Sequence, residues 1–363
     1  MKVERNKIFF RVDINLHIAT GHLMRCLAIA DAFKEIGCDV EFISADSEPE
    51  NIVKARNFQF HSLESNWEDM EGEIEKLNIY LESKDAQILI VDSYKVTEKY
   101  FKDITDSVYT VYIDDLDAMV YDVNCIICYA CYYKAFNYEN RYLNLFHEGK
   151  ITRKTSFLLG PKYAPLRNEF GQSREKIISK RVNKLLLMSG GADPYDSLGR
   201  ILNGLDVDRF QNIWVICGRY NNKVEELEKE YKNHNSVIFK KNVVSIKEYM
   251  EQADLAISAG GSTLYELCSI GTPTISFSYA DNQLSNVHCF DESGIISYAG
   301  DIRYDDVPKK ARELMEILSE QEERRKTLSR AMRDLVDGRG AFQIAKSLTK
   351  GEKDEQCSRV SVL

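Results

Sequence analysis

The junction between a buried strand and an amphipathic helix near the N-terminus constrains the fold of this chain more than any other feature. Residues 8–12 are apolar enough for a buried strand, and apolar residues between positions 23 and 33 recur on one face of a helix. Gly21 and His22 lie where the strand gives way to the helix. This pattern is typical of the first strand and helix of a doubly wound α/β fold, which binds ligands at the carboxyl ends of its strands.

His22 is the candidate general base at this junction. In the first turn of a helix the dipole disfavours imidazolium, so we expect a neutral imidazole that can accept a proton. Arg11, Asp13 and Arg25 surround the same turn, and so many polar groups at the end of a buried strand indicate a polar ligand. We therefore predict that Arg11, Asp13 and Gly21 contact a substrate. The alternative interpretation is that His22 only caps the helix.

The length of the chain predicts two domains. At 363 residues it exceeds one ordinary hydrophobic core, and a two-domain protein offers a cleft for a ligand. We place the first domain at residues 1–165 and the second at residues 166–350. Residues 351–363 contain few apolar side chains, so we expect them to form a flexible tail.

Composition argues against two classes of partner. Hydrophobic residues make up 44% of the chain, and no segment approaches the roughly 20 apolar residues that a membrane span needs. The net charge is -9 and the lysines are scattered among acids, whereas nucleic-acid binding needs a concentrated basic face. Residues 1–7 lack the apolar core of a signal peptide. We expect a cytoplasmic protein that binds neither a membrane nor nucleic acid.

Strands and helices alternate in both predicted domains, which favours parallel sheets covered by helices on both faces. In the first domain, further strands are predicted at residues 40–43, 88–91, 108–113 and 125–128, with a helix at 65–81. In the second domain, strands are predicted at 185–188, 213–217, 237–239, 255–258 and 274–277, and helices at 195–205, 223–231, 262–270, 307–336 and 341–348.

A glycine turn between the strand at 255–258 and the helix that follows predicts a diphosphate site. Gly260 and Gly261 let backbone N–H groups approach a phosphate, and the helix N-terminus adds partial positive charge. The hydroxyls of Ser262 and Thr263 can donate to its oxygens. Glu266, one turn later, is placed to accept the two hydroxyls of a ribose. The alternative interpretation is an N-capped helix with a glycine turn.

A second glycine pair and an amide extend this predicted nucleotide site. Gly190 and Gly191 follow the first predicted strand of the second domain, and Gly260 follows a later strand in the same way. Asn282 follows the strand at 274–277, at the edge where open α/β sheets bind ligands. We predict that both glycine turns bind one ligand and that Asn282 hydrogen-bonds a sugar or a phosphate; the alternative is a helix cap.

The remaining cysteines and histidines do not predict a metal site. Cys125, Cys128 and Cys131 have part of the spacing of an iron–sulfur ligand run, but a nearby fourth cysteine is missing and the stretch has the composition of a buried strand. No histidine has zinc-ligand spacing. His17 has no defined geometric relation to His22, so we interpret it as a structural loop residue.

Several stretches, in the same order along the chain, resemble the UDP-2,4-diacetamido-2,4,6-trideoxy-β-L-altropyranose hydrolase family of pseudaminic acid biosynthesis and its relatives in spore-coat polysaccharide synthesis. The resemblance extends over most of residues 7–345. It is carried by Arg11–Asp13, Thr20–Cys26, Val91–Tyr94, Ile113–Asp115, Leu159–Ala164, Ser258–Glu266 and Ala280–Gln283. It implies the GT-B architecture, in which two Rossmann-like parallel-sheet lobes face a cleft.

The resemblance also implies an activity. In this family, water attacks the anomeric carbon of a UDP-sugar with inversion, which releases UDP and the free sugar without a cofactor or a metal. The family's catalytic histidine corresponds to His22 and its substrate-contacting tyrosine to Tyr94. Its cleft asparagine corresponds to Asn282 and its ribose-binding glutamate to Glu266. Asp13 is expected either to orient the histidine or to bind the sugar.

Elementary chemistry agrees with this assignment, and two other functions fit the same motifs. A diphosphate is a good leaving group, so one base that activates water suffices.

A GT-B glycosyltransferase would use the same UDP site with an acceptor in place of water, because fold and nucleotide loop do not determine the reaction. A non-catalytic nucleotide-sugar sensor is the third possibility. Ala19, where family members commonly have glycine, leaves the identity of the sugar open.

Overall fold

The computed structural model describes residues 7–15, 21–191, 193–218, 220–241, 243 and 245–349. The chain divides into two compact units, residues 1–168 with 339–363 and residues 169–338. The division lies close to the predicted boundary at residue 165. The last helix differs from the prediction, because it belongs to the first unit and not to the second. His17, Ala19 and the predicted tail at 351–363 lie outside the described residues.

The first unit is built on a seven-stranded parallel sheet. Its strands are β1 (Lys7–Val12), β2 (Asp39–Ser44), β3 (Gln59–Ser62), β4 (Ile88–Asp92), β5 (Tyr109–Ile113), β6 (Cys125–Cys128) and β7 (Ser156–Leu159). Its helices are α1 (Gly21–Glu35), α2 (Glu50–Ala55), α3 (Ile74–Ser83), α4 (Glu98–Asp103), α5 (Tyr138–His147) and α13 (Gly340–Thr349), with a short 3₁₀ helix η1 (Glu71–Glu73) before α3.

The strand order of this sheet places its ligand-binding edge. The order is β3-β2-β1-β4-β5-β6-β7, so the direction of winding reverses between β1 and β4. Val12, the last residue of β1, lies opposite Asp92, the last residue of β4. In doubly wound sheets the crevice outside such a reversal is where ligands bind. The turn that leads to His22 therefore leaves the sheet at its reversal point.

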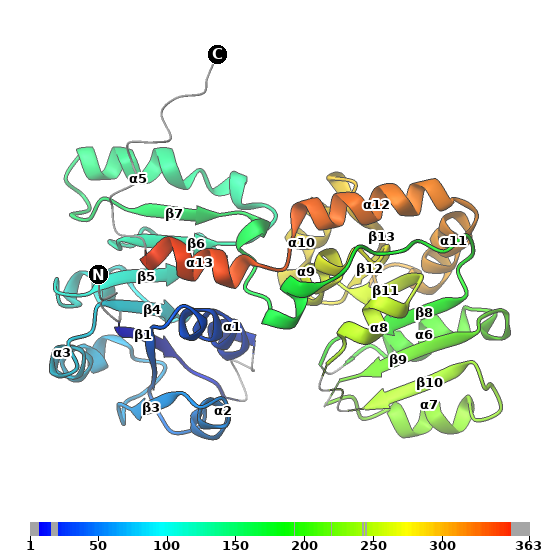
Figure 1. Cartoon of the computed structure of the whole chain (residues 1–363), viewed down its shortest axis with the longest axis horizontal. Coiled ribbons are helices and arrows are strands. Elements are labelled where there is room, and N and C mark those ends of the chain that lie inside the picture. The colour runs from blue at the N-terminus through cyan, green and yellow to red at the C-terminus, as the bar shows by residue number, and fades with distance from the viewer. Residues whose placement is uncertain are drawn as a thin grey trace, which may run out of the picture. The chain divides into compact units, whose positions relative to one another are not determined.

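Side chains of β1 alternate between the two faces of the sheet, as a pleated strand requires. Phe10 and Val12 join the buried cluster that includes residues of α1 and α13, whereas Phe9 joins the cluster that includes residues of α3 and α4. In Figure 1, α1 and α13 lie next to each other on one face of this sheet. Arg11 has the same parity as Phe9 and so points away from α1.

The second unit repeats this plan with a six-stranded parallel sheet in the order β10-β9-β8-β11-β12-β13. Its strands are β8 (Lys184–Met188), β9 (Asn212–Cys217), β10 (Val237–Lys241), β11 (Leu255–Ala259), β12 (Thr274–Ser278) and β13 (Ser297–Asp301). Its helices are α6 (Ser197–Asn203), α7 (Val224–Glu230), α8 (Lys247–Gln252), α9 (Thr263–Ile270), α10 (Asp281–Glu292), α11 (Val307–Glu320) and α12 (Glu322–Leu335).

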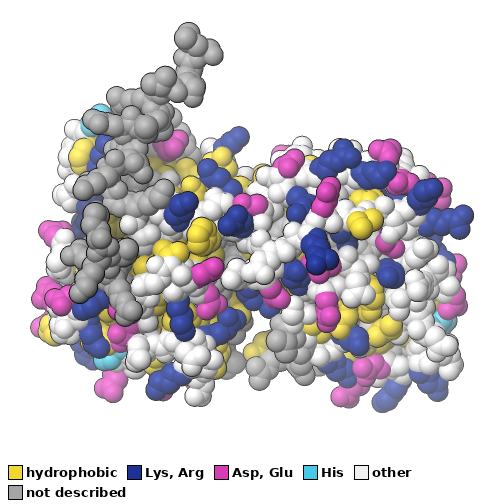
Figure 2. Space-filling view, viewed as in Figure 1, with side chains coloured by type: hydrophobic (Ala, Val, Ile, Leu, Met, Phe, Trp, Pro, Cys, Tyr) yellow, Lys and Arg dark blue, Asp and Glu magenta, His cyan; other side chains and the backbone are white. Residues whose placement is uncertain are grey.

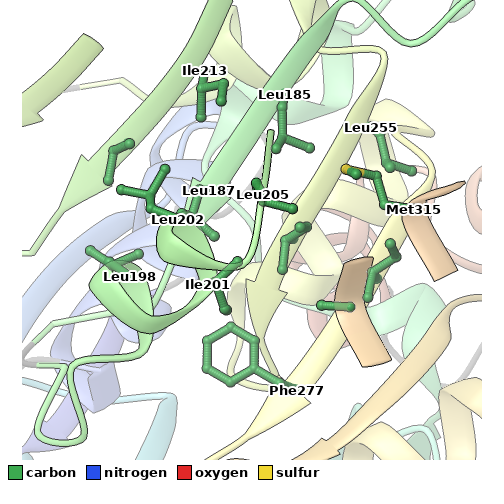
Figure 3. Close-up of a cluster of buried hydrophobic side chains, with 14 of the residues drawn as sticks. Leu185, Leu187, Leu198, Ile201, Leu202, Leu205, Ile213, Leu255, Phe277 and Met315 are labelled. Atoms are coloured by element: carbon green, nitrogen blue, oxygen red, sulfur yellow. The ribbon is translucent and has the colours of Figure 1, made fainter. Parts of the chain in front are cut away.

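A continuous apolar core lies between this sheet and its helices. Figure 3 shows Leu185 and Leu187 of β8 together with Ile201 of α6, Phe277 of β12 and Met315 of α11. All five side chains are buried, and each large aliphatic or aromatic side chain removed from water contributes about 1.5–3 kcal/mol. This packing holds the carboxyl ends of β8 and β11, where the glycine turns lie, in a fixed relation.

Several features of the C-terminal third differ from the sequence-based prediction, which does not include helices α8 and α10. The helix expected over residues 307–336 is two helices, α11 and α12, which break at Gln321. Strand β13 was not predicted, because its sequence contains Gly300 and Asp301, which strands disfavour.

The distribution of surface charge and the lengths of the helices relate to the predictions about nucleic acid and membranes. Figure 2 shows Lys and Arg side chains interspersed with Asp and Glu side chains over the visible face of each unit. Within the described ranges, no helix is both long enough and apolar enough to cross a membrane.

Candidate active site

His22 lies in the first turn of α1 and is held by a carboxylate from the neighbouring strand. Its side chain is 10% exposed, and its Nδ1 atom lies 2.5 Å from Oδ1 of Asp92. A carboxylate can only accept, so Nδ1–H is the donor in this pair and Nε2 is the ring nitrogen left for another partner. The arrangement leaves the imidazole able to take a proton at Nε2.

Arg25 keeps Asp92 ionised. Its Nε lies 2.6 Å from Oδ2 of Asp92 and its Nη2 lies 2.5 Å from Oδ1, which is a two-point contact. Burial alone would raise the pKa of Asp92, but the charge and hydrogen bonds of Arg25, with a smaller effect of His22, outweigh burial and hold that pKa below its usual range. Asp92 is therefore a carboxylate in the folded protein.

Two further side chains, Tyr94 and Asp115, extend the histidine site, which we define as His22, Arg25, Asp92, Tyr94 and Asp115. Nη1 of Arg25 lies 3.0 Å from Oδ2 of Asp115, and the Tyr94 hydroxyl donates to the same oxygen at 3.2 Å. The Tyr94 ring meets the His22 ring edge-on, with centroids 4.6 Å apart. Burial, and then the charge of Asp115, raise the pKa of Tyr94, so its hydroxyl remains a donor. Half of Tyr94 is exposed.

The structure differs from the prediction at Arg11 and Asp13. Arg11 has no exposed surface and binds both carboxylate oxygens of Glu73, at 2.6 and 2.7 Å. Its Nη1 lies 2.7 Å from Oδ2 of Asp13, whose Oδ1 accepts from the Ser44 hydroxyl and the Ala45 amide. These groups are buried and are paired with one another, an arrangement that stabilises the first unit.

The orienting role expected for Asp13 belongs instead to Asp92. Asp13 is tied to the turn after β2, whereas Asp92 makes the direct contact with His22. Asp92 and Asp115 both lie in stretches that carry the family resemblance, and both follow predicted strands. A rule that places the fourth strand beside the first in a doubly wound sheet could have identified Asp92.

The space around Gly21 is open. A Cβ atom added there would meet no other atom within 4 Å. Its predicted contact with substrate stays a prediction.

In the second unit, Gly260 and Gly261 differ in the space available beside their Cα atoms. A Cβ atom on Gly260 would lie 2.1 Å from Cγ1 of Val287 in α10, so only glycine allows this close helix packing. A Cβ atom on Gly261 would meet nothing within 4 Å. Gly260 therefore serves packing, and the open position beside Gly261 is the one where a ligand can approach the backbone.

The N-terminus of α9 lies next to this open position. The amide of Gly260 donates to the Phe277 carbonyl. In the described part of the chain, the amides of Gly261, Ser262 and Thr263 make no backbone hydrogen bond. Successive free amides at a helix N-terminus form an anion-binding site. This geometry is compatible with the predicted phosphate contact.

The other glycine turn lies at the reversal point of the same sheet, after β8. Gly190 has a φ of +86°, which favours glycine. The Ser189 hydroxyl is buried and has no hydrogen-bond partner among the described residues. The N-terminus of α6 is already capped, because Asp193 accepts from the amides of Ser197 and Leu198. This turn can therefore offer the Ser189 hydroxyl to a ligand, but not the capped amides of Ser197 and Leu198.

Glu266 and Asn282 lie where the prediction placed them in the secondary structure. Glu266 is in the first turn of α9 and is partly exposed. Asn282 is the second residue of α10 and is exposed. Their contacts with ribose and sugar remain predictions.

The cysteine cluster is split by the sheet. Cys125 packs in the cluster on the α1 face and Cys128 in the cluster on the opposite face, so the two thiols cannot bind one metal. Burial raises the pKa of each thiol to about 12, whereas metal ligation needs thiolates. Across the described residues, no group of three His, Cys, Asp or Glu side chains is placed to hold a metal ion.

Comparison with known proteins bears on both units. Residues 186–339 match the glycosyltransferase family 28 C-terminal domain. The chain is 24% identical over 282 residues to the UDP-2,4-diacetamido-2,4,6-trideoxy-beta-L-altropyranose hydrolase of Campylobacter jejuni, an alignment that covers 77% of this chain and 94% of that protein. It is 25% identical over 297 residues to an uncharacterized protein of Methanocaldococcus jannaschii, covering 79% of this chain but only 58% of that protein.

The structural comparison shows the fold. MurG of Acinetobacter baumannii superimposes with a TM-score of 0.67 at 12% identity, over 95% of this chain and 99% of MurG. The sequence similarity to the Campylobacter hydrolase supports the family resemblance found in the motifs. The chain thus has a GT-B fold of two Rossmann-like parallel-sheet units, and its second unit matches the C-terminal domain of glycosyltransferase family 28.

Proposed function

We propose that this chain hydrolyses a UDP-linked 2,4-diacetamido-2,4,6-trideoxy sugar at its anomeric carbon and releases UDP and the free sugar for nonulosonic (pseudaminic) acid synthesis. The observation that carries the proposal is the His22–Asp92 pair at the reversal point of the first sheet. It supplies one oriented base, which is all that the displacement of a diphosphate by water requires. The 24% identity to the Campylobacter hydrolase supports the same reaction.

In this proposal the first unit supplies the base. Nε2 of His22 accepts a proton from water as the water oxygen bonds to the anomeric carbon, on the face opposite to UDP. The bond between that carbon and the UDP oxygen breaks, and its electron pair leaves with UDP. Asp92 accepts from Nδ1–H and stabilises the imidazolium, which then returns its proton to solvent. Tyr94 contacts the sugar with its exposed half.

The second unit holds the nucleotide in this proposal. The free amides of Gly261, Ser262 and Thr263 and the hydroxyls of the last two bind the diphosphate. Glu266 accepts from the ribose, and Asn282 binds the sugar or a phosphate. Fixed donors at the diphosphate stabilise the charge that develops on the leaving group.

The experiment that separates hydrolysis from transfer omits any acceptor. The purified protein is incubated with a panel of UDP-diacetamido sugars, and UDP and free sugar are measured. Equal amounts of the two products support hydrolysis. Release of UDP only after an acceptor is added supports a glycosyltransferase, and binding without turnover supports a nucleotide-sugar sensor.

Glu266→Gln is expected to weaken binding of UDP and of substrate by roughly tenfold, because a charge-assisted hydrogen bond contributes about 1.5–3 kcal/mol. The maximal rate should fall much less, since a remote contact that binds ground and transition states equally changes mainly KM. UDP titration calorimetry and steady-state kinetics test this. Unchanged UDP affinity with a collapsed maximal rate would place Glu266 in the chemistry.

Activity is expected to survive chelators. The proposed reaction uses fixed backbone donors at the diphosphate in place of a metal ion. The measurement is UDP release before and after dialysis against EDTA, with metal content determined on the same sample. Loss of activity that a divalent ion restores would contradict the prediction.

A further inference from the structure

The contacts of the histidine site form a closed ring. Arg25 binds Asp92 through Nε and Nη2 and Asp115 through Nη1. Asp115 also accepts from the Tyr94 hydroxyl, and the Tyr94 ring meets His22 edge-on. The ring thus runs from His22 through Asp92, Arg25, Asp115 and Tyr94 back to His22. Of these five residues, only His22 and Tyr94 contact the substrate in the proposed reaction.

We propose that Arg25 and Asp115 are positioning residues that hold the His22 imidazole in one orientation from two sides. Arg25 acts through Asp92, and its Nη2 also lies 3.1 Å from Nδ1 of His22. Asp115 acts through Tyr94. The inference rests on the proposed function, because it takes His22 as the base. The orientation of the imidazole can nevertheless be measured in the protein without substrate.

The two-point contact explains why Arg25 matters beyond its charge. A carboxylate that accepts one hydrogen bond can rotate about its Cβ–Cγ bond, whereas the planar fork of a guanidinium fixes the carboxylate plane. Oδ1 of Asp92 accepts from both His22 and Arg25, so fixing this oxygen also fixes the direction of the Nδ1–H bond. Lysine would keep the charge but lose the fork.

Asp115 restrains the other side of the imidazole. Its Oδ2 accepts from Arg25 at 3.0 Å and from the Tyr94 hydroxyl at 3.2 Å. Tyr94 is half exposed and lies in the loop after β4, so this hydrogen bond is what fixes its ring against His22. The Arg25 and Asp115 side chains are only 11% and 18% exposed, so water competes weakly for these contacts.

The place of these residues in the fold fits the same role. Arg25 is one turn after His22 on α1, Asp92 ends β4, and Asp115 lies just beyond the end of β5. The network therefore ties α1 to two adjacent strand ends. A helix that carried the base without this tie could shift relative to the sheet edge.

The test compares Arg25→Lys, Arg25→Met and Asp115→Asn. Misplacement of a base by about 1 Å can cost about a hundredfold, so we expect kcat to fall roughly hundredfold in Arg25→Met and roughly tenfold in the two milder variants. KM and UDP affinity should change less than about twofold, because none of these residues is assigned to binding. Arg56→Lys, at a partly exposed Arg–Asp pair of the same unit, is the matched control.

A double-mutant cycle tests the Asp115–Tyr94 arm. If Asp115 acts through the Tyr94 hydroxyl, Asp115→Asn and Tyr94→Phe should together cost no more in kcat than the larger single effect. Fully additive losses would overturn this arm. If Arg25→Met does not fold, Arg25→Lys and this double-mutant cycle provide the test.

Proton NMR of the imidazole provides a readout that does not depend on turnover. The Nδ1–H proton of His22 should give a deshielded, slowly exchanging signal, assigned by its loss in His22→Gln. We expect this signal to be lost or broadened in Arg25→Met and shifted in Arg25→Lys. An unchanged signal in Arg25→Met would overturn the inference even if activity falls. An Arg25-dependent signal in a protein without hydrolase activity would instead refute the proposed function and leave the positioning role standing.

Discussion

His22→Ala is expected to lower the rate of UDP-sugar hydrolysis by roughly a hundredfold to ten-thousandfold, the range typical for removal of a positioned general base. The protein should still fold, because the side chain leaves no buried charge without a partner: Asp92 keeps its two-point contact with Arg25. UDP affinity should be unchanged, since the nucleotide contacts are assigned to the second unit. Steady-state kinetics and UDP calorimetry measure the two quantities.

The chain contains its own control for this substitution. His234 also has its Nδ1 within hydrogen-bond distance of a carboxylate, at 2.9 Å from Oδ1 of Asp208, but the pair is exposed on the second unit. His234→Ala should leave turnover near the wild-type value. Near-normal turnover in a folded His22→Ala protein would remove His22 from the chemistry.

Glu73→Ala is expected to destabilise the first unit by about 3–5 kcal/mol, the usual cost of breaking a buried ion pair by removing one partner. Glu73 is fully buried and binds Arg11 through both oxygens, and it also accepts from Tyr100 and Ser65. Its loss leaves the Arg11 guanidinium buried, with Asp13 as the remaining carboxylate partner among the described residues.

The two tryptophans allow this destabilisation to be assigned to one unit. Trp67 lies in the first unit and Trp214 in the second, so in a Trp214→Phe background tryptophan fluorescence reports urea unfolding of the first unit alone. Glu71→Ala is the control, because Glu71 is two residues away but pairs with Lys99 at the surface. Equal midpoints for the two variants would show that the buried network does not stabilise the unit.

The alternation of strands and helices could be predicted because parallel strands buried on both faces are continuous apolar runs. The runs at 8–12, 88–91 and 255–258 all lie within observed strands. Strand β7 was missed because its apolar run is only three residues long. Helix α5 was missed because half of its residues are polar and its buried side chains are tyrosines. The packing of α13 on the first unit depends on tertiary contacts that no local pattern records.

The candidate site was predictable only in part. His22 could be found because its neighbours in sequence define the strand–helix junction. Its partner Asp92 is 70 residues away, and only the strand order brings it to His22. Arg11 was misassigned because its position near the end of β1 suggested a ligand contact. Strand parity turns it to the opposite face from α1, toward Glu73.

The most direct test of the central claim is to run the reaction in ¹⁸O-labelled water without an acceptor and to determine the isotope in the released UDP. UDP phosphates do not exchange oxygen with water on this timescale, whereas a free sugar can. If His22 directs water to the anomeric carbon, UDP is released without ¹⁸O, and the His22→Ala protein releases it at least roughly a hundredfold more slowly. Labelled UDP, which would mean attack at phosphorus, or no UDP release until an acceptor is added, would contradict the account.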